Sequence, residues 1–534
     1  MKMRKRLGYF ALAAVSMLIL IFSTACEQND MITCGGCGPR IEFPINDEVT
    51  LTWWYDYDNT YYNGDFTRLE DHPFMKEMYQ RTNVTVSIME PTSADPKTEL
   101  EMLMASGDMP DMVTHSGYTP EHCGRNIDAL AQNEVYQALN DYIFRQMRNF
   151  MLLKDEHPVV DALIVTQQNN IMFIPKLKHL TDYENKKQTE GLVLRKDILD
   201  LVNCDVPTTV AEWETVLRAF KALSVTNPLA LDFNEQGAFE QDVFLSAYGV
   251  KVGAYIDSET GNVTCGAVSD KLYEYITLMN RWISDGLLVT DVKLTEEAKL
   301  EEKTVGAWFS SADEMTVLTA SALTEDYELV GAPDPVLNKG EKISMRGSFA
   351  PVGTAEYDSV FISALCENGP LACRWLDEFF TEEMYERTSY GIEGIDYLEN
   401  ADGVITFTEK ITQNRNGVCY GIAQNAFLES FYCDSNVMID YGYNGNAKIA
   451  VEEWSESSSE YSFFDLGGIT YTEEEMKYLS KTANSEVRAA RTVKNMILGT
   501  EPLENWQTYC EIVREDAETY TAVMQSVWDR YITI

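Results

Sequence analysis

Apolar and polar residues alternate or recur at helical spacing along the first part of the chain, which predicts an α/β protein. Residues 48–55 alternate and are rich in β-forming side chains, so we expect a strand there. A helix from 72, a strand at 84–88, a helix at 99–106 and a strand that begins near 111 follow. Strands and helices in this alternating order indicate βαβ units and a mainly parallel sheet.

A second series of elements begins near residue 190. It opens with an apolar strand at 191–194, followed by a helix at 210–223. Thr209 is placed to cap that helix, and Glu212 stands at capping-box spacing from it. Later segments predict a hairpin at 252–266, a helix at 272–285 and a largely helical final region that starts after Thr472. The chain therefore contains material for a second α/β body.

The N-terminus has the pattern of a secretory signal. Four basic residues precede an apolar run over 7–22, and small residues then lead into Cys26. Small residues before a cysteine resemble a bacterial lipobox, although Ser23 occupies the position where a lipobox usually has Leu. We expect a lipoprotein signal peptide over 1–25, a lipid on Cys26, a flexible tether over 26–47, and a location on the outer face of the cell membrane. Ordinary signal cleavage and an uncleaved anchor are the alternatives.

The charge balance restricts the class of partner. The chain has 42 Lys and Arg against 85 Asp and Glu, a formal net charge of −43. Proteins that bind nucleic acid without sequence preference need basic side chains to neutralise phosphates, so this composition argues against a nucleic-acid partner. It also disfavours docking on anionic lipid through a basic surface.

Motifs for catalysis and metal binding are absent from the sequence. There are five His, none at metal-ligand spacing, and no nucleophile elbow, phosphate loop or HExxH motif occurs. Cys34 and Cys37 form a CxxC pair in a Gly-rich stretch, where a free or oxidised structural pair is the simpler interpretation. We therefore expect no enzyme activity, no cofactor and no metal.

Several short elements, spread over most of the chain, resemble bacterial family 1 extracellular solute-binding proteins, especially the lipoprotein branch that serves sugar ABC importers. They occur in the order and spacing of that family. The elements are Thr52-Trp53-Trp54, Ser106-Gly107-Asp108-Met109-Pro110-Asp111, Leu194-Arg195-Lys196-Asp197, Pro207-Thr208-Thr209, Gly306-Ala307-Trp308, Tyr390-Gly391-Ile392-Glu393-Gly394 and Trp528-Asp529-Arg530-Tyr531.

The resemblance implies a two-lobed periplasmic-binding-protein-like fold of type II, with mainly parallel sheets flanked by helices and a hinge between the lobes. Lobe 1 would comprise roughly 48–190 and 330–390, and lobe 2 roughly 191–329 and 391–534. The protein would bind a carbohydrate, more specifically an oligosaccharide, in the interlobe cleft. It would close around this ligand and deliver it, as a monomer, to the permease subunits of an ABC importer.

Candidate ligand-binding residues come from two arguments. Ligands of open α/β sheets lie beyond the carboxyl ends of the strands, which points to residues near 54–56 and 114–115. The family pattern points to the residue after the hinge strand and to an aromatic loop near 308, and glycine-rich loops add two tyrosines. The candidates are Trp54, Tyr55, Asp56, Thr114, His115, Arg195, Trp308, Phe309, Tyr390 and Tyr441.

Each candidate also has a structural interpretation. Trp54 and Asp56 could belong to packing instead of a cleft, and Arg195 could form a salt bridge to one of the many acids. At the level of function, a surface carbohydrate-active enzyme and a binder of another solute, such as a peptide, remain the alternatives. A pair of carboxylates is not evidence for a carbohydrate-active enzyme here, because among 85 acidic residues some pair always has suitable spacing.

Overall fold

The structure is a computed structural model in which the chain forms two compact units, Met1–Arg40 and Ile41–Ile534. The structure describes residues 39–531 apart from 56–67, 93–94, 115–127, 129–130, 132–134, 167, 178–179, 181–186, 235–236, 240–241, 258–259, 325, 344–358, 402, 413, 415–420, 423–430, 435 and 459–471.

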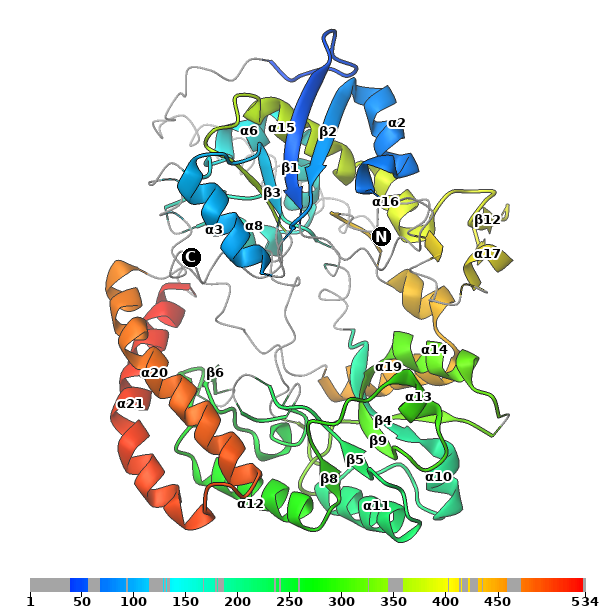
Figure 1. Ribbon diagram of the computed structural model, residues 1–534, viewed down its shortest axis with the longest axis vertical. Helices are drawn as coiled ribbons and strands as arrows, with labels where there is room; N and C mark the ends of the chain where they lie inside the picture. The colour runs from blue at the N-terminus through cyan, green and yellow to red at the C-terminus, as the bar shows by residue number, and fades with distance from the viewer. Residues whose placement is uncertain are drawn as a thin grey trace, which may run out of the picture. The chain divides into compact units, whose positions relative to one another are not determined.

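The first sheet has four strands in the order β11-β3-β1-β2 (Figure 1). β1 pairs in parallel with both neighbours, whereas β11 runs antiparallel to β3. The alternating segment predicted as a strand is thus confirmed as the inner strand β1. The strands are β1 (Val49–Tyr55), β2 (Val84–Met89), β3 (Met112–Thr114) and β11 (Val360–Ile362).

Helices from two distant parts of the chain pack with this sheet around one core. α2 follows β1 and leads back into β2, and residues beyond 360 return to complete the same core. The helices are α2 (Pro73–Thr82), α3 (Pro96–Ser106), α6 (Asn140–Gln146), α7 (Arg148–Glu156), α8 (Val159–Ile164), α15 (Gly369–Leu376) and α16 (Glu382–Tyr390), with the 3₁₀ turns η2 (Leu69–Asp71) and η5 (Asp377–Phe380).

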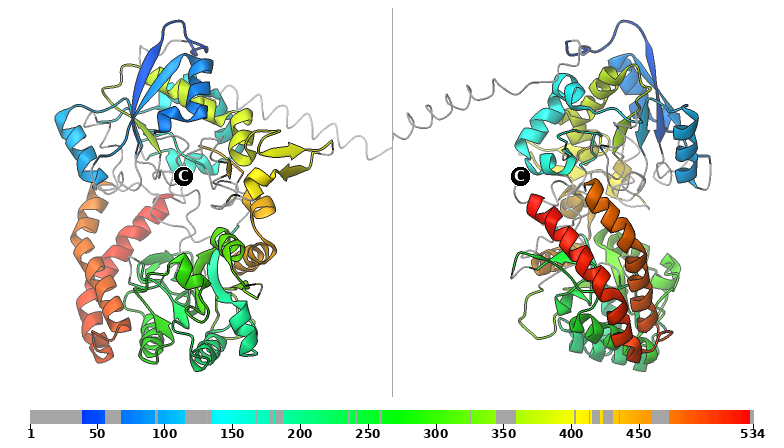
Figure 2. Two further views of the ribbon diagram at one scale, coloured as in Figure 1. Left: turned by 45° about the vertical axis from the view of Figure 1, so that its right-hand side comes forward. Right: turned by 90° about the vertical axis from the view of Figure 1, so that its left-hand side faces the viewer.

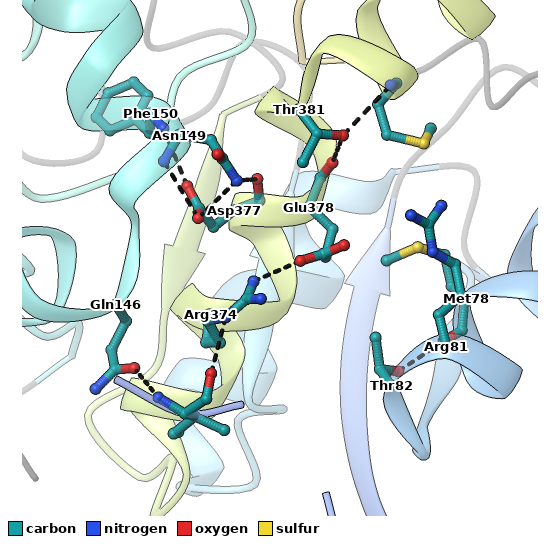
Figure 3. Close-up of polar contacts among 12 residues, drawn as sticks. Met78, Arg81, Thr82, Gln146, Asn149, Phe150, Arg374, Asp377, Glu378 and Thr381 are labelled. Atoms are coloured by element: carbon teal, nitrogen blue, oxygen red, sulfur yellow. Dashed lines mark hydrogen bonds and ion pairs between the residues drawn. The ribbon is translucent and has the colours of Figure 1, made fainter. Parts of the chain in front are cut away.

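Buried polar contacts tie the late segment to the early one (Figure 3). The fully buried Asp377 carboxylate accepts hydrogen bonds from the backbone N–H groups of Asn149, at 3.3 Å, and Phe150, at 3.0 Å, in the first turn of α7. These N–H groups have no partner within the helix, and the positive end of its dipole favours a carboxylate. Arg374 bridges the Ile41 carbonyl oxygen at 3.0 Å and Glu378 at 2.6 Å, so α15 also fixes the start of this unit.

The second sheet has five strands in the order β10-β4-β9-β5-β8. It is mixed: β4 is antiparallel to β10 and β9, while β5 is parallel to β9 and β8. The strands are β4 (Glu190–Arg195), β5 (Leu229–Ala230), β8 (Leu288–Val289), β9 (Ala307–Ser311) and β10 (Leu329–Ala332).

Helices cover this sheet and make two further hydrophobic clusters. The predicted capping box at Thr209 and Glu212 is confirmed at the start of α11, and a second one starts α20 at Thr472. α20 and α21 lie side by side over most of their length (Figure 2). The helices are α10 (Lys196–Leu201), α11 (Val210–Ala222), α12 (Asp270–Ser284), α13 (Glu296–Leu300), α14 (Ala312–Ser321), α19 (Gly445–Ser458), α20 (Glu473–Ile497) and α21 (Trp506–Tyr531).

Two small hairpins complete the fold. The hairpin predicted over 252–266 is confirmed as β6 (Ala254–Ile256) and β7 (Val263–Cys265), which pack on α21. A second hairpin, β12 (Tyr397–Glu399) and β13 (Ile405–Phe407), forms a small cluster with α17 (Glu409–Thr412). The predicted lobe boundaries stay a prediction, but β10 belongs to the second sheet, so the chain leaves that sheet after residue 332.

Candidate functional site

The carboxyl ends of β1 and β3 lie next to each other. Tyr55 pairs in register with Thr114, so two of the candidates predicted from strand ends are neighbours. The indole N–H of Trp53 donates to Thr114 Oγ1 at 3.0 Å, and the Trp53 and Tyr55 rings stack with centroids 4.7 Å apart. Trp54, Tyr55 and Thr114 are at most 1% exposed. A saccharide could not contact these three side chains without displacing what covers them.

Lys176 adds a charge at this strand end. Its ammonium donates to the Tyr55 hydroxyl at 2.8 Å and lies 4.9 Å from the centre of the same ring. The side chain is buried, as lysines rarely are unless they are paired. Sequence reasoning missed this residue, because a single lysine in an irregular segment carries no recognisable pattern.

Asp111 has a structural role at the start of β3. Its Oδ2 accepts from the Thr52 backbone N–H at 2.8 Å and from Thr52 Oγ1 at 2.9 Å, and the Asp111 N–H donates back to Thr52 Oγ1. This reciprocal arrangement holds the entry of β3 against β1. It positions the strand ends and leaves the carboxylate engaged with the fold.

Arg195 ends β4 and is held by several acceptors. Its guanidinium makes a two-point contact with Asp197, at 2.8 and 2.7 Å, and Nη1 donates to the carbonyl oxygens of Lys299 and Glu301. The guanidinium also lies 4.3 Å from the centre of the Tyr327 ring. The side chain is only 3% exposed. These contacts favour the salt-bridge interpretation of Arg195 over the ligand-binding one.

Trp308 lies in the middle of the second sheet and is fully buried. Its indole N–H donates to Glu314 Oε2 at 3.3 Å, and the same carboxylate accepts from Lys299 and from Ser310. The Trp308 ring belongs to a cluster with side chains of α14 and α19. Its neighbour Phe309 is half-buried and packs against a different cluster. The contacts of Trp308 therefore stabilise the fold and present no accessible ring face.

Tyr441 is the most accessible of the described aromatic candidates, and Tyr390 is half-buried. The Tyr390 ring lies 5.7 Å from Tyr397, and Tyr441 lies edge-on to Phe407 at 5.7 Å. Tyr397 and Phe407 are a cross-strand pair of the β12–β13 hairpin, so the two candidates contact the same small element. Burial, followed by the nearby charge of Asp434, raises the pKa of Tyr390 to about 12. The Tyr390 phenol therefore acts as a neutral hydrogen-bonding group at physiological pH.

Three predicted residues, Asp56, His115 and the lipidation site Cys26, lie outside the described residues. Within the described part of the chain, no group of three or more His, Cys, Asp or Glu side chains is arranged to hold a metal ion. Among those same residues, no helix is both long and apolar enough to span a membrane.

The architecture has clear counterparts among solved structures. The alginate-binding protein AlgQ2, in a structure without calcium ion, superposes with a TM-score of 0.70 over 92% of this chain and 100% of that chain, at 19% identity. The substrate-binding protein FusA of S. pneumoniae, in complex with kestose, gives a TM-score of 0.70 over 91% of this chain and 99% of that chain, at 16% identity. The chain has the fold of ABC-importer solute-binding proteins. This solute-binding fold is the one expected from the sequence resemblance.

The chain also has a curated relative. It is 22% identical over 354 residues to the polygalacturonan/rhamnogalacturonan-binding protein YtcQ of Bacillus subtilis. That match spans 64% of this chain and 66% of YtcQ, just under two thirds of the relative's length. No family model matches the chain. The relatives are described as binding proteins, and none of the three carries the name of an enzyme.

Proposed function

We propose that the chain is the extracellular substrate-binding protein of an ABC importer for oligosaccharides. The observation that carries the proposal is the superposition on AlgQ2 and FusA over more than nine tenths of this chain. YtcQ is named for two pectic polymers, AlgQ2 for alginate, and FusA was solved with kestose. Since all three take saccharides, a saccharide is the ligand class with the most support. Fold alone does not determine function, so binding has to be tested directly.

The remaining parts of the proposal follow from the sequence. A lipid on Cys26 would anchor the chain to the outer face of the membrane, and the following segment up to about residue 47 would act as a tether. A monomer that closes around its ligand would then present one liganded form to the permease subunits. Tyr441, which is 38% exposed, is the strongest ligand contact among the described candidates, and the half-buried Tyr390 contacts the same hairpin.

A panel of oligosaccharides tests the proposal against a carbohydrate-active enzyme. The mature protein is titrated with oligogalacturonides, alginate oligomers and fructo-oligosaccharides while intrinsic Trp fluorescence is followed, and the sugars are then analysed by chromatography. We expect a saturable fluorescence change with at least one sugar, recovered intact. Turnover of the sugar would support the enzyme alternative, and a response to peptides alone would support a peptide binder.

Small-angle X-ray scattering tests closure. With the saccharide that binds in the panel, we expect a smaller radius of gyration at saturation, and no change with a sugar that gives no fluorescence response. An unchanged radius of gyration at full occupancy would contradict the hinge mechanism while leaving the binding result intact.

A further inference from the structure

A cavity of about 500 Å³ opens at the outer edge of the first sheet. Helix α2, strand β2, the turn η2 and one residue of α15 form its wall, so it lies within a single sheet-and-helix body. Its volume falls in the range of small-molecule sites. The chemically distinctive lining residues are Glu70, Lys76, Tyr79, Gln80, Ser87 and Trp375.

The edge strand offers main-chain hydrogen-bonding groups to this cavity. β2 is the last strand of the sheet, and the N–H groups of alternate residues point to its outer edge. The Val84 N–H is taken by Thr82 Oγ1 at 3.1 Å, and the Ile88 N–H by Glu70 Oε1 at 2.7 Å. Val86 lies between them and lines the cavity, so its N–H and C=O face the same edge. With both ends of the edge capped, the site suits a small polar ligand better than an added peptide strand.

Two aromatic residues, each with one polar group, give the cavity an apolar surface. The Tyr79 side chain is 40% exposed, so its ring is accessible for stacking. Trp375 is fully buried, so it contributes to the inner end of the cavity. Within the part of the chain that the structure describes, the Trp375 indole N–H has no hydrogen-bond partner. A buried donor without a partner costs about 1–3 kcal/mol, so this tryptophan carries a local cost in stability.

The charge of the cavity selects among polar ligands. Glu70 is compensated, because its Oε2 lies 2.6 Å from Arg68 and its Oε1 accepts from the Ile88 N–H. Lys76 is exposed, and no acidic side chain among the described residues forms an ion pair with it. Although the chain has a net charge of −43, no acidic side chain in the part that the structure describes pairs with this ammonium group at the cavity. The ammonium group matches a ligand carboxylate.

We propose that this cavity is a second saccharide site, which takes a sugar unit bearing a carboxylate, that is, a uronic acid. Tyr79 stacks on the apolar face of the ring, Lys76 pairs with the carboxylate, and Gln80, Ser87 and the Val86 main chain bond to hydroxyl groups. The site lies outside the ligand residues predicted from strand ends and does not depend on the importer function.

Counting binding sites by equilibrium dialysis tests this proposal. The mature protein is equilibrated with digalacturonate up to millimolar concentrations, and in parallel with its neutral dimethyl ester. The variants are Lys76→Gln, Lys76→Arg and Tyr79→Ala, and the matched control is Lys271→Gln, which alters an exposed lysine of α12. Thermal unfolding of each variant checks that the fold is retained.

We expect Lys76→Gln and Tyr79→Ala to lose one digalacturonate per chain, or to raise its Kd at least tenfold, while any other site keeps its affinity. Lys76→Arg retains the charge and should retain the site, and Lys271→Gln should match the wild type. The dimethyl ester should bind the cavity at least tenfold more weakly than the acid. Equal stoichiometry and Kd in wild type, Lys76→Gln and Tyr79→Ala would overturn the proposal, as would equal binding of acid and ester. Neither outcome bears on the importer function, which the panel above tests.

Discussion

Replacing Trp308 tests whether this tryptophan stabilises the fold or stacks on a ligand. The sequence resemblance predicts a ligand contact, whereas the side chain is 0% exposed and packs among residues of β4, α14 and α19. Truncation of a fully buried tryptophan to alanine typically costs about 3–5 kcal/mol. Trp308→Ala also removes the indole N–H that donates to Glu314. Because total stabilities are only about 5–15 kcal/mol, this is a large fraction.

Urea unfolding followed by far-UV circular dichroism measures this cost without relying on tryptophan fluorescence. We expect Trp308→Ala to lose about 3–5 kcal/mol. Trp308→Phe keeps an aromatic ring and should lose about 1–2 kcal/mol, mainly for the missing hydrogen bond. The half-buried Trp528, which donates to the Gly261 carbonyl oxygen near the surface, is a suitable control, and Trp528→Ala should lose less than Trp308→Ala. An unchanged urea midpoint in Trp308→Ala, together with weaker saccharide binding, would refute this reasoning and restore the stacking role.

Two further changes probe local contacts. Asp197→Ala leaves the buried Arg195 without its carboxylate and should lower the free energy of unfolding by about 3–5 kcal/mol, as for other broken buried ion pairs. A loss under about 1 kcal/mol would mean that the backbone carbonyl oxygens suffice to stabilise the buried guanidinium. Hydrogen bonds from Thr208 and Thr209 lower the pKa of Glu212 below 4.5. The contribution of Glu212 to the free energy of unfolding is therefore complete above its unfolded-state pKa and disappears as the pH falls through its folded-state pKa. Glu212→Ala should therefore cost about 1 kcal/mol at pH 7 and progressively less towards pH 3, and a pH-independent difference in urea unfolding would contradict this.

Local signals in the sequence were sufficient for many elements. The N-cap of α11 was predictable because Thr209 and Glu212 interact within one turn, without help from the rest of the chain. The alternation of residues 48–55 likewise identified β1. These features depend on neighbours in sequence, and sequence displays them directly.

The candidate site was less predictable, because burial depends on segments far along the chain. Trp308 is covered in part by α19, whose residues 445–458 give no sign in the sequence of what they will pack against. Arg195 is held by carbonyl oxygens of residues 299 and 301, and a backbone acceptor has no sequence signature. The Lys176 contact with Tyr55 was missed because the two side chains come from segments far apart in the sequence.

The order in which the first sheet is assembled has a consequence for biosynthesis. β11 and η5 are made long after β1, β2 and β3, yet β11 closes the edge of β3 and η5 supplies the Asp377 contacts to α7. Non-local pairing of this kind slows folding, because the entropy of a long loop must be lost first. A nascent chain that has emerged only as far as the second sheet therefore still exposes one side of β3. Chain connectivity thereby delays folding of the first body until after residue 380.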